Sequence, residues 1–225
     1  MSLASRVTGR YFTDPEWESD FESLAFTAEA LIAHPDPDDA ELGRLSRRAT
    51  AVLADWEEID MAGRGARRAA LNAAARVRAA DVALDQSLTE FARDLLAHVH
   101  GDRNHELYTR LFPEPHEDVI ELGVDAELPS ATLLLMALDA DPSLPAHLKS
   151  HHGALRVAVQ LGTRALAERA DTLADIGRHH ARVEAWRDGA AAMMRNLHRW
   201  INNVGEARNM PPRWASAFFL VPPTA

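Results

Sequence analysis

The amino-acid sequence predicts an all-α fold, an elongated antiparallel bundle of about five to seven helices with no sheet. No segment alternates apolar and polar residues over six positions while also being rich in Val, Ile, Thr or aromatic residues, as a half-buried strand does. Apolar residues instead recur at spacings of three and four along most of the 225 residues. The composition, 47% hydrophobic and 26% charged, is that of an ordinary globular protein, and we expect a single domain over residues 1–225.

The first two helices are predicted from a start signal and from their apolar stripes. Asp14-Pro15 follows an N-terminal arm of residues 1–13 and suits a helix start, because Asp caps the first turn and Pro needs no amide partner there. The stripe of this helix is Trp17, Phe21, Leu24, Ala28 and Leu31. A second helix from about Asp39 to Met61 has the heptad spacing of a coiled coil, at Leu42, Leu45, Ala49, Val52, Trp56 and Ile59.

We expect three helices within residues 14–100, because Gly63-Arg64-Gly65 predicts a break after the second. The third helix then runs to about His100. The residues expected on its packing face, which we call its seam, are Ala70, Ala74, Val77, Asp81, Leu84, Leu88, Phe91, Leu95 and His98. Alanine at one end of the seam lets a neighbouring helix approach closely, whereas Phe and Leu at the other end require more room.

Residues 101–115 are expected to be a connector with one or two helical turns around Leu107–Phe112. Pro113 and Pro115 end these turns, since each lacks an amide and clashes with the preceding turn. A helix from about His116 to Asp139 follows, and Leu128-Pro129 predicts a kink or break in it.

The helical half of the chain, residues 116–207, ends with a long stretch from about Pro145 to Ala207. Gly177 or Gly189 is a candidate interruption of it. The stretch has one unbroken seam at alternating spacings of three and four: Val159, Gly162, Leu166, Arg169, Leu173, Ile176, His180, Val183, Arg187, Ala190, Met194, Leu197, Ile201 and Val204.

Charge is segregated along the chain. Residues 1–62 carry 5 basic and 14 acidic side chains, residues 63–78 carry 5 and none, residues 79–141 carry 3 and 14, and residues 142–225 carry 11 and 6. This pattern predicts either acidic helices packed beside the basic C-terminal helix or a basic face open to an acidic partner. The net charge of -10 argues against general binding to nucleic acid or to an anionic membrane.

The signatures of common enzymes are missing from the sequence. Cys is absent, which excludes thiolate chemistry and cysteine-ligated metal centres. There is no G-x-S-x-G, G-x-x-x-x-G-K-[ST], G-x-G-x-x-G or H-E-x-x-H motif. None of the 11 histidines has Glu three residues before it, as carboxylate-bridged di-metal bundles require, and we expect no cofactor.

Histidines at helical spacing are the candidates for a metal site. His147 and His151 lie four residues apart, as do His180 and Glu184, so each pair shares one helix face. Asp94 and His98 have the same spacing. The alternative is that these side chains are solvated or hydrogen-bonded in the core, because eleven histidines produce such pairs by chance.

Four polar residues interrupt the predicted seams: Asp81 in one, and Arg169, His180 and Arg187 in the other. A buried unpaired charge is costly. We therefore expect Asp81 to contact one of the three basic residues and to fix the helix register. The alternative is that the seam rotates at these positions and all four side chains reach water.

The C-terminal tail, residues 208–225, holds an apolar cluster outside the long helices: Trp214, Phe218, Phe219, Leu220 and Val221. We expect this cluster to fold back over the open end of the bundle. The alternative is an interaction tail, because aromatic anchors of this kind dominate many interfaces.

The sequence predicts a non-enzymatic structural or adaptor protein that binds a protein partner or a second copy of itself, with no nucleic-acid or membrane partner. The alternative is a bundle that binds a metal or small molecule through histidines, with a hydrolytic or redox activity centred on them. Ala131–Leu138 is too short to cross a bilayer and residues 1–13 lack the apolar run of a secretory signal, so a cytoplasmic protein is expected. Lys149 is the only lysine among 24 basic residues, a bias typical of GC-rich bacterial genomes.

Overall fold

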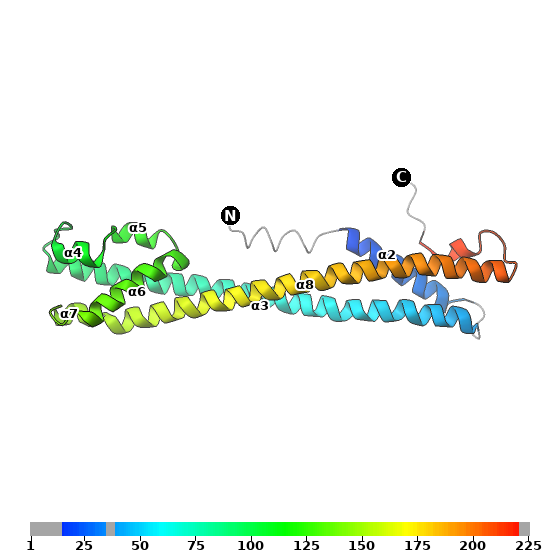
Figure 1. The fold of residues 1–225 in the computed structure, drawn as a ribbon, viewed down its shortest axis with the longest axis horizontal. Coiled ribbons are helices and arrows are strands. Elements are labelled where there is room, and N and C mark those ends of the chain that lie inside the picture. Colours follow the sequence, from blue (N-terminus) through cyan, green and yellow to red (C-terminus); the bar gives the residue numbers. More distant parts are fainter. Residues whose placement is uncertain (1–14, 35–38, 221–225) are drawn as a thin grey trace. The chain divides into compact units, whose positions relative to one another are not determined.

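The computed structural model describes residues 15–34 and 39–220 (Figure 1). All regular structure in these residues is helical, which confirms the all-α prediction. The predicted arm at residues 1–13 lies outside the described residues. The chain divides into two compact units: unit 1 comprises residues 1–67 and 176–225, and unit 2 comprises residues 68–175. Each unit is described separately, and the expected single domain stays a prediction.

Two helices are much longer than the rest, α3 (Ala40–His98) and α8 (His152–Ala207). Unit 1 also contains α2 (Pro15–Ile32) and a 3₁₀ turn, η1 (Ala215–Phe218). Unit 2 also contains α4 (Glu106–Leu111), α5 (His116–Ile120), α6 (Val124–Ala140) and α7 (Ala146–Lys149).

The predicted break at Gly63-Arg64-Gly65 is wrong, because α3 runs through these residues without interruption. A Cβ at Gly63 would lie within 2.5 Å of the His179 ring of α8. Glycine is therefore needed at this position for space between two helices rather than to end one. Among the described residues up to residue 100 there are accordingly two helices and not three.

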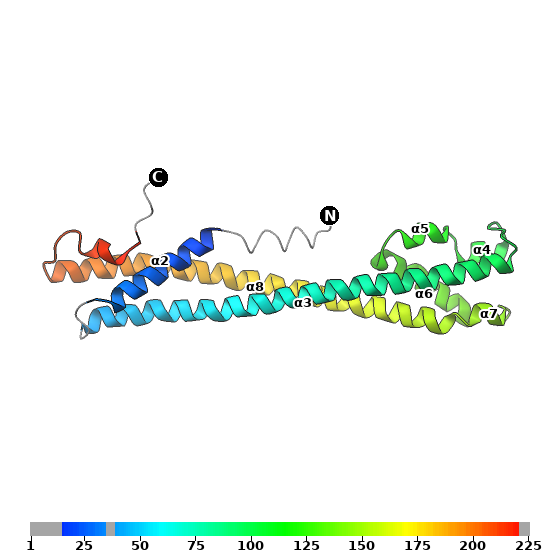
Figure 2. The same ribbon diagram turned by 180° about the vertical axis from the view of Figure 1, so that it is seen from behind.

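An aromatic cluster forms the centre of unit 1. The rings of Trp56 on α3 and Trp186 on α8 have centroids 4.5 Å apart, and Phe21 of α2 lies 6.4 and 6.5 Å from them. The indole N–H of Trp186 donates to the backbone carbonyl of Val52, at 2.8 Å, so the polar atom of this buried ring is satisfied. α2 thus covers the groove that α3 and α8 form within this unit (Figure 2).

The start of α3 is capped by a buried carboxylate that also binds an arginine. Asp39 Oδ1 accepts from the backbone amides of Glu41 and Leu42, at 3.1 and 3.2 Å. The guanidinium of Arg208, just beyond the end of α8, binds both carboxylate oxygens of Asp39. The hydrogen bond from Arg208 is the main reason why the pKa of Asp39 falls to about 2.

Unit 2 has its own core, built from α3, α8 and the four short helices between them. Its largest fully buried side chains are Leu84, Leu88, Phe91, Leu95, Leu148, Leu155 and Glu127. α6 packs closely on α8, since a Cβ at Gly162 would lie 2.9 Å from Cγ2 of Val124 and 3.1 Å from Cδ2 of Leu128. The seam of α3 passes through Ala73 and Ala80, both buried, rather than through Ala74, which is exposed.

The helix predicted from about His116 to Asp139 is two helices, α5 and α6. Gly123, with φ of +84°, separates them, because this backbone conformation is open mainly to glycine. The predicted break at Leu128-Pro129 is absent, because α6 continues past Pro129; the kink stays a prediction. Pro129 and Asp125 are both exposed, so the carbonyl that loses its amide partner can be solvated.

The long C-terminal stretch is confirmed in outline. α8 passes through Gly177 and Gly189 without interruption, and the break in this stretch falls earlier, between α7 and α8. Most of the predicted seam is buried or half-buried, but Leu173 is exposed.

In the part of the chain that the structure describes, no helix combines the length and apolar character needed to cross a membrane. The cytoplasmic location stays a prediction.

The close contact at Gly162 predicts opposite effects for one substitution at two glycines of α8. Gly162→Ala should lower the free energy of unfolding by about 1 kcal/mol, because the added methyl overpacks the contact with α6. Gly189→Ala should raise it by up to about 1 kcal/mol, since no atom lies within 4 Å and Ala favours the helix. Urea unfolding followed by circular dichroism measures both; an equal gain at the two positions would contradict the close packing.

The bond between Asp39 and Arg208 predicts acid sensitivity of unit 1. The pKa is lowered in the folded state, so the stabilisation is present above about pH 4 and is lost as the pH falls towards 2. Asp39→Asn retains a capping oxygen but loses the charge, and should cost about 2 kcal/mol at pH 7 and much less near pH 2. Glu41→Gln is the control, because the exposed contact of Glu41 with Arg208, at 3.9 Å, contributes little. A pH-independent effect of Asp39→Asn would contradict this account.

Candidate functional site

Three acidic residues gather where α6 meets α3 in unit 2. Asp81 Oδ1 accepts from the backbone amide of Val124, at 2.6 Å, and Glu127 Oε1 accepts from the amide of Gly123, at 3.1 Å. Gly123 itself supplies no side-chain cap. The two carboxyl groups therefore satisfy the first amides of α6, and Asp81 places negative charge at the positive end of its dipole.

The carboxyl groups of Glu127 and Asp85 interact within this cluster. Glu127 Oε2 and Asp85 Oδ1 are buried and accept no hydrogen bond from another group in the described residues, so a proton on one of the two satisfies both. The side chain of Glu127 is fully buried. Burial is the largest cause that raises the pKa of Glu127, to about 8, and the charges of Asp85 and Asp81 add to it. Burial also raises the pKa of Asp85. Glu127 therefore carries the proton at neutral pH.

The arrangement of this acidic cluster fits a structural role. Within the described residues, no group of three or more His, Cys, Asp or Glu side chains is placed to hold a metal ion. Glu127 is also sealed from solvent, which leaves a substrate no path to its carboxyl group. The cluster fixes the start of α6 against α3.

The predicted pairing of Asp81 with Arg169, His180 or Arg187 is wrong, because the partner of Asp81 is the backbone amide of Val124. A helix start that lacks its own capping residue offers unsatisfied amides, and these meet the need of a half-buried carboxylate. Arg187 lies 3.7 Å from Glu184, one turn earlier on the same helix.

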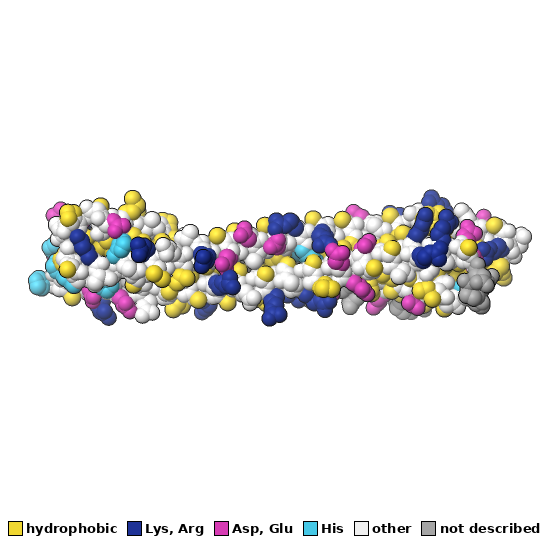
Figure 3. Space-filling view, turned by 90° about the horizontal axis from the view of Figure 1, so that it is seen from below, with side chains coloured by type: hydrophobic (Ala, Val, Ile, Leu, Met, Phe, Trp, Pro, Cys, Tyr) yellow, Lys and Arg dark blue, Asp and Glu magenta, His cyan; other side chains and the backbone are white. Residues whose placement is uncertain are grey.

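The two predicted pairs Asp94/His98 and His147/His151 face each other in unit 2. His151 Nε2 lies 2.9 Å from Asp94 Oδ2, and the rings of His98 and His147 have centroids 5.2 Å apart. Histidine side chains gather on this end of the unit, where α4 and α7 lie (Figure 3). The bond to His151 is the largest cause that lowers the pKa of Asp94.

The other predicted pair, His180 and Glu184, lies in unit 1. Burial lowers the pKa of His180, and the charge of Glu184 partly opposes this effect. Glu184 is also the residue that contacts Arg187, at 3.7 Å. This pair alone offers one imidazole and a carboxylate already next to a guanidinium, which is a poor donor set for a metal.

The tail folds back on unit 1, as expected. Phe218 and Phe219 are buried in its core, and Phe219 stacks on His198 at 3.5 Å between centroids. Trp214 packs edge-on against Phe218 at 4.9 Å. The alternative of an interaction tail is therefore wrong for Phe218 and Phe219, whose rings are covered. Leu220 is 43% exposed, and Val221 lies outside the described residues.

α6 exposes a second apolar face opposite the one that it buries. Leu133 and Met136 are 66% and 62% exposed. This face continues into a groove of about 390 Å³ at the end of α6, lined by Arg110, Leu111, Ala137, Ala140, Asp141, Pro142 and Ser143. Arg110 and Asp141 form an ion pair, at 2.6 Å, within the lining.

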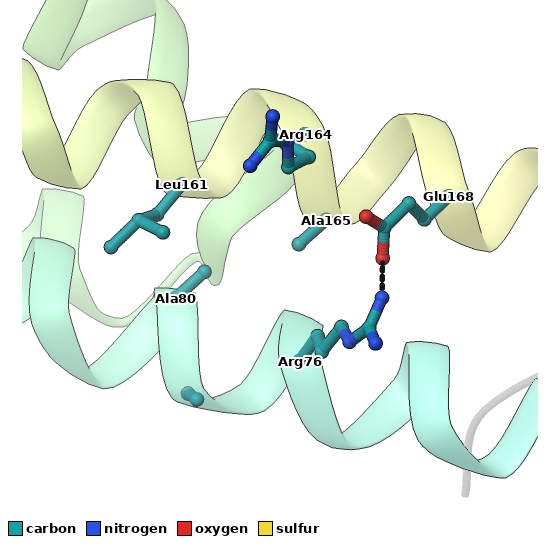
Figure 4. A pocket seen from close by; sticks show the side chains of 7 residues that line it. Arg76, Ala80, Leu161, Arg164, Ala165 and Glu168 are labelled. Carbon is teal, nitrogen blue, oxygen red and sulfur yellow. Dashed lines mark hydrogen bonds and ion pairs between the residues drawn. The ribbon is translucent and has the colours of Figure 1, made fainter.

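A smaller cavity, of about 180 Å³, lies between α3 and α8 in unit 2 (Figure 4). Leu161, Ala80 and Ala165 give it an apolar floor, and the ion pair of Arg76 with Glu168 closes one side. Its volume is below the roughly 300 Å³ at which pockets for small molecules begin. This cavity does not support a cofactor site.

Comparison with known proteins adds no identification, since no family model matches the chain and neither the curated proteins nor the solved structures contain a significant match.

The sequence reasoning missed Asp85 and Glu127. A signal for Glu127 was present: it occupies one position of an apolar stripe at spacings of three and four, with Val124, Ala131, Leu134 and Leu138. An acidic residue in such a stripe indicates a buried carboxyl group that needs a partner. The stripe of α6 could have been read in the same way as the interrupted seams of α3 and α8.

The buried carboxyl group predicts that Glu127→Gln stabilises the protein at alkaline pH. The pKa of Glu127 is raised in the folded state, so stability is lost as the pH rises from about 4.5 through about 8. Gln keeps an acceptor for Gly123 and cannot ionise, and should add about 2 kcal/mol at pH 8 but much less at pH 5. Urea unfolding at the two pH values measures the difference.

Asp125→Asn serves as the control, because Asp125 is exposed in the same turn of α6. Its effect should be small and equal at both pH values. A Glu127→Gln variant that matches the wild type at pH 8 would show that the buried proton has no energetic role.

Proposed function

We propose that the chain is a non-enzymatic helical protein that acts through contact with another protein, as a structural or adaptor component. The observation that carries the proposal is the exposed apolar face of α6. α6 packs one face in the core, and it carries a second apolar face on which Leu133 and Met136 are exposed. An apolar patch of this kind on a folded protein marks a contact surface.

The surroundings of this face favour a basic partner. The segment from His116 to Asp141 contains seven acidic residues and no Lys or Arg. Asp125 and Asp139 lie near the two ends of α6, and both are exposed. An antiparallel contact between two copies of α6 would bring like charges together, whereas an apolar helix with basic side chains at its flanks would be complementary.

The groove at the end of α6 supports the same partner. Ala137 and Ala140 continue the exposed face, and Leu111 and Pro142 form apolar walls beyond it. A side chain of the partner helix can enter this groove and act as an anchor. The acidic surroundings also favour a protein partner over nucleic acid.

The double variant Leu133→Glu/Met136→Glu tests this proposal. Both side chains are exposed, so the stability of the variant should stay within about 1 kcal/mol of the wild type. We expect native mass spectrometry of untagged protein from its own host to show a stoichiometric complex for the wild type and free chain for the variant. The complex should also weaken as salt is raised, because the flanking contacts are ionic.

Thr163→Glu is the matched control, since it adds a charge to an exposed position of unit 2 on a different helix, α8. It should leave the complex intact. A wild-type chain that is monomeric and free of any partner would contradict the proposal. So would a complex, with a second copy or another protein, that survives in the double variant.

A further inference from the structure

We infer that His98 and His147 form a binding site for a divalent transition-metal ion at the end of unit 2. The two residues come from different elements, the last turn of α3 and the short helix α7. Neither the fold nor the proposed contact surface of α6 requires this pair. The inference therefore stands independently of the proposed function.

The spacing of the two rings matches the spacing in a shared metal site. The bond from a zinc ion to an imidazole nitrogen is about 2.0–2.1 Å, and the ring centre lies about 1 Å beyond that nitrogen. Two rings on one tetrahedral ion therefore have centroids about 5 Å apart. The centroids of His98 and His147 are 5.2 Å apart, with 52° between the ring planes.

Both rings are available to a ligand. His98 and His147 are exposed. Among the described residues, neither side chain makes a hydrogen bond or an ion pair, unlike His151 and His152, which contact Asp94 and Asp139 at 2.9 Å. Two exposed imidazoles side by side without an acidic partner leave their nitrogen lone pairs to solvent, and one metal ion can bind both in place of water.

The neighbouring contact holds the pair in place. The 2.9 Å contact between His151 and Asp94 joins the same two segments, four residues along from each member of the pair. His151 lies two residues beyond the end of α7, so the contact limits the movement of α7 relative to α3 and little ordering is needed when the ion binds. With two imidazoles and no third protein ligand in the described residues, water completes the coordination.

The donor set selects the class of ion. Neutral imidazole suits zinc, copper and nickel, whereas calcium and magnesium require oxygen ligands. An ion held by both residues also links positions about 50 residues apart in the chain. It should therefore stabilise the packing of α7 on α3, because a bound ligand favours the folded state.

The experiment is a titration of the full-length, untagged protein with zinc chloride, followed by calorimetry. We expect one zinc ion per chain for the wild type. His98→Asn and His147→Asn should each weaken binding at least about tenfold, since loss of a residue that merely orients a ligand already costs 10–100-fold. His105→Asn is the matched control: His105 is exposed in the same unit, its cap on Leu107 is preserved by Asn, and zinc affinity should not change.

Electron paramagnetic resonance with copper(II) gives a second readout that does not depend on affinity. The wild type should show two coordinated imidazole nitrogens, and each single variant should show one. Circular dichroism should give the same helix content for all variants, since both side chains are exposed. Unchanged zinc affinity in both variants, no binding by the wild type, or a copper signal that keeps two imidazoles in each variant would overturn the site.

Discussion

Each of two helices packed side by side can bury only one stripe of apolar side chains against the other. This limit explains the architecture of both units. In each unit, a part of α3 pairs with a part of α8, and the pair needs a third layer to close its groove. In unit 1 that layer is α2 with the turn η1, which bring Phe21 and Phe218 onto the pair. In unit 2 it is the set of short helices from α4 to α7, and α6 supplies the largest share.

The third layer of unit 2 explains why carboxyl groups are buried there. α6 begins at a glycine in a left-handed conformation, and this residue offers no side chain to cap the first turn. The amides are satisfied by Asp81 from α3 and by Glu127 from the helix itself. Burial of Glu127 next to Asp85 is tolerable because one proton is retained between them. A strongly perturbed carboxyl group often marks a catalytic site, but here a helix start accounts for it without any substrate.

The helices could be predicted from the sequence because the buried positions of a helix recur every three or four residues along the chain. The seam from Leu42 to Ile59 is an example, since every position is buried or half-buried. What failed depends on contacts between distant segments. Gly63 was read as a helix end because sequence does not reveal that His179 lies against it. The sequence showed the two i, i+4 pairs, Asp94/His98 and His147/His151. It could not show that the two pairs contact each other, because that depends on how α3 is aligned with the segment around α7.

The partner of Asp81 also could not be predicted from the sequence, because it too lies on a distant segment. Sequence reasoning required a basic side chain for it, since an isolated buried carboxylate is costly. A backbone amide at a helix start meets the same need, and it carries no signature of residue type. The same explanation, that backbone amides satisfy carboxyl groups, applies to the buried side of α6. The carboxyl groups on its inner face are satisfied by backbone amides and a shared proton. On its outer side are Asp125 and Asp139, and Asp139 also contacts His152 of α8 at 2.9 Å. They set the electrostatic potential around Leu133 and Met136, and that potential is complementary to the basic partner that we propose.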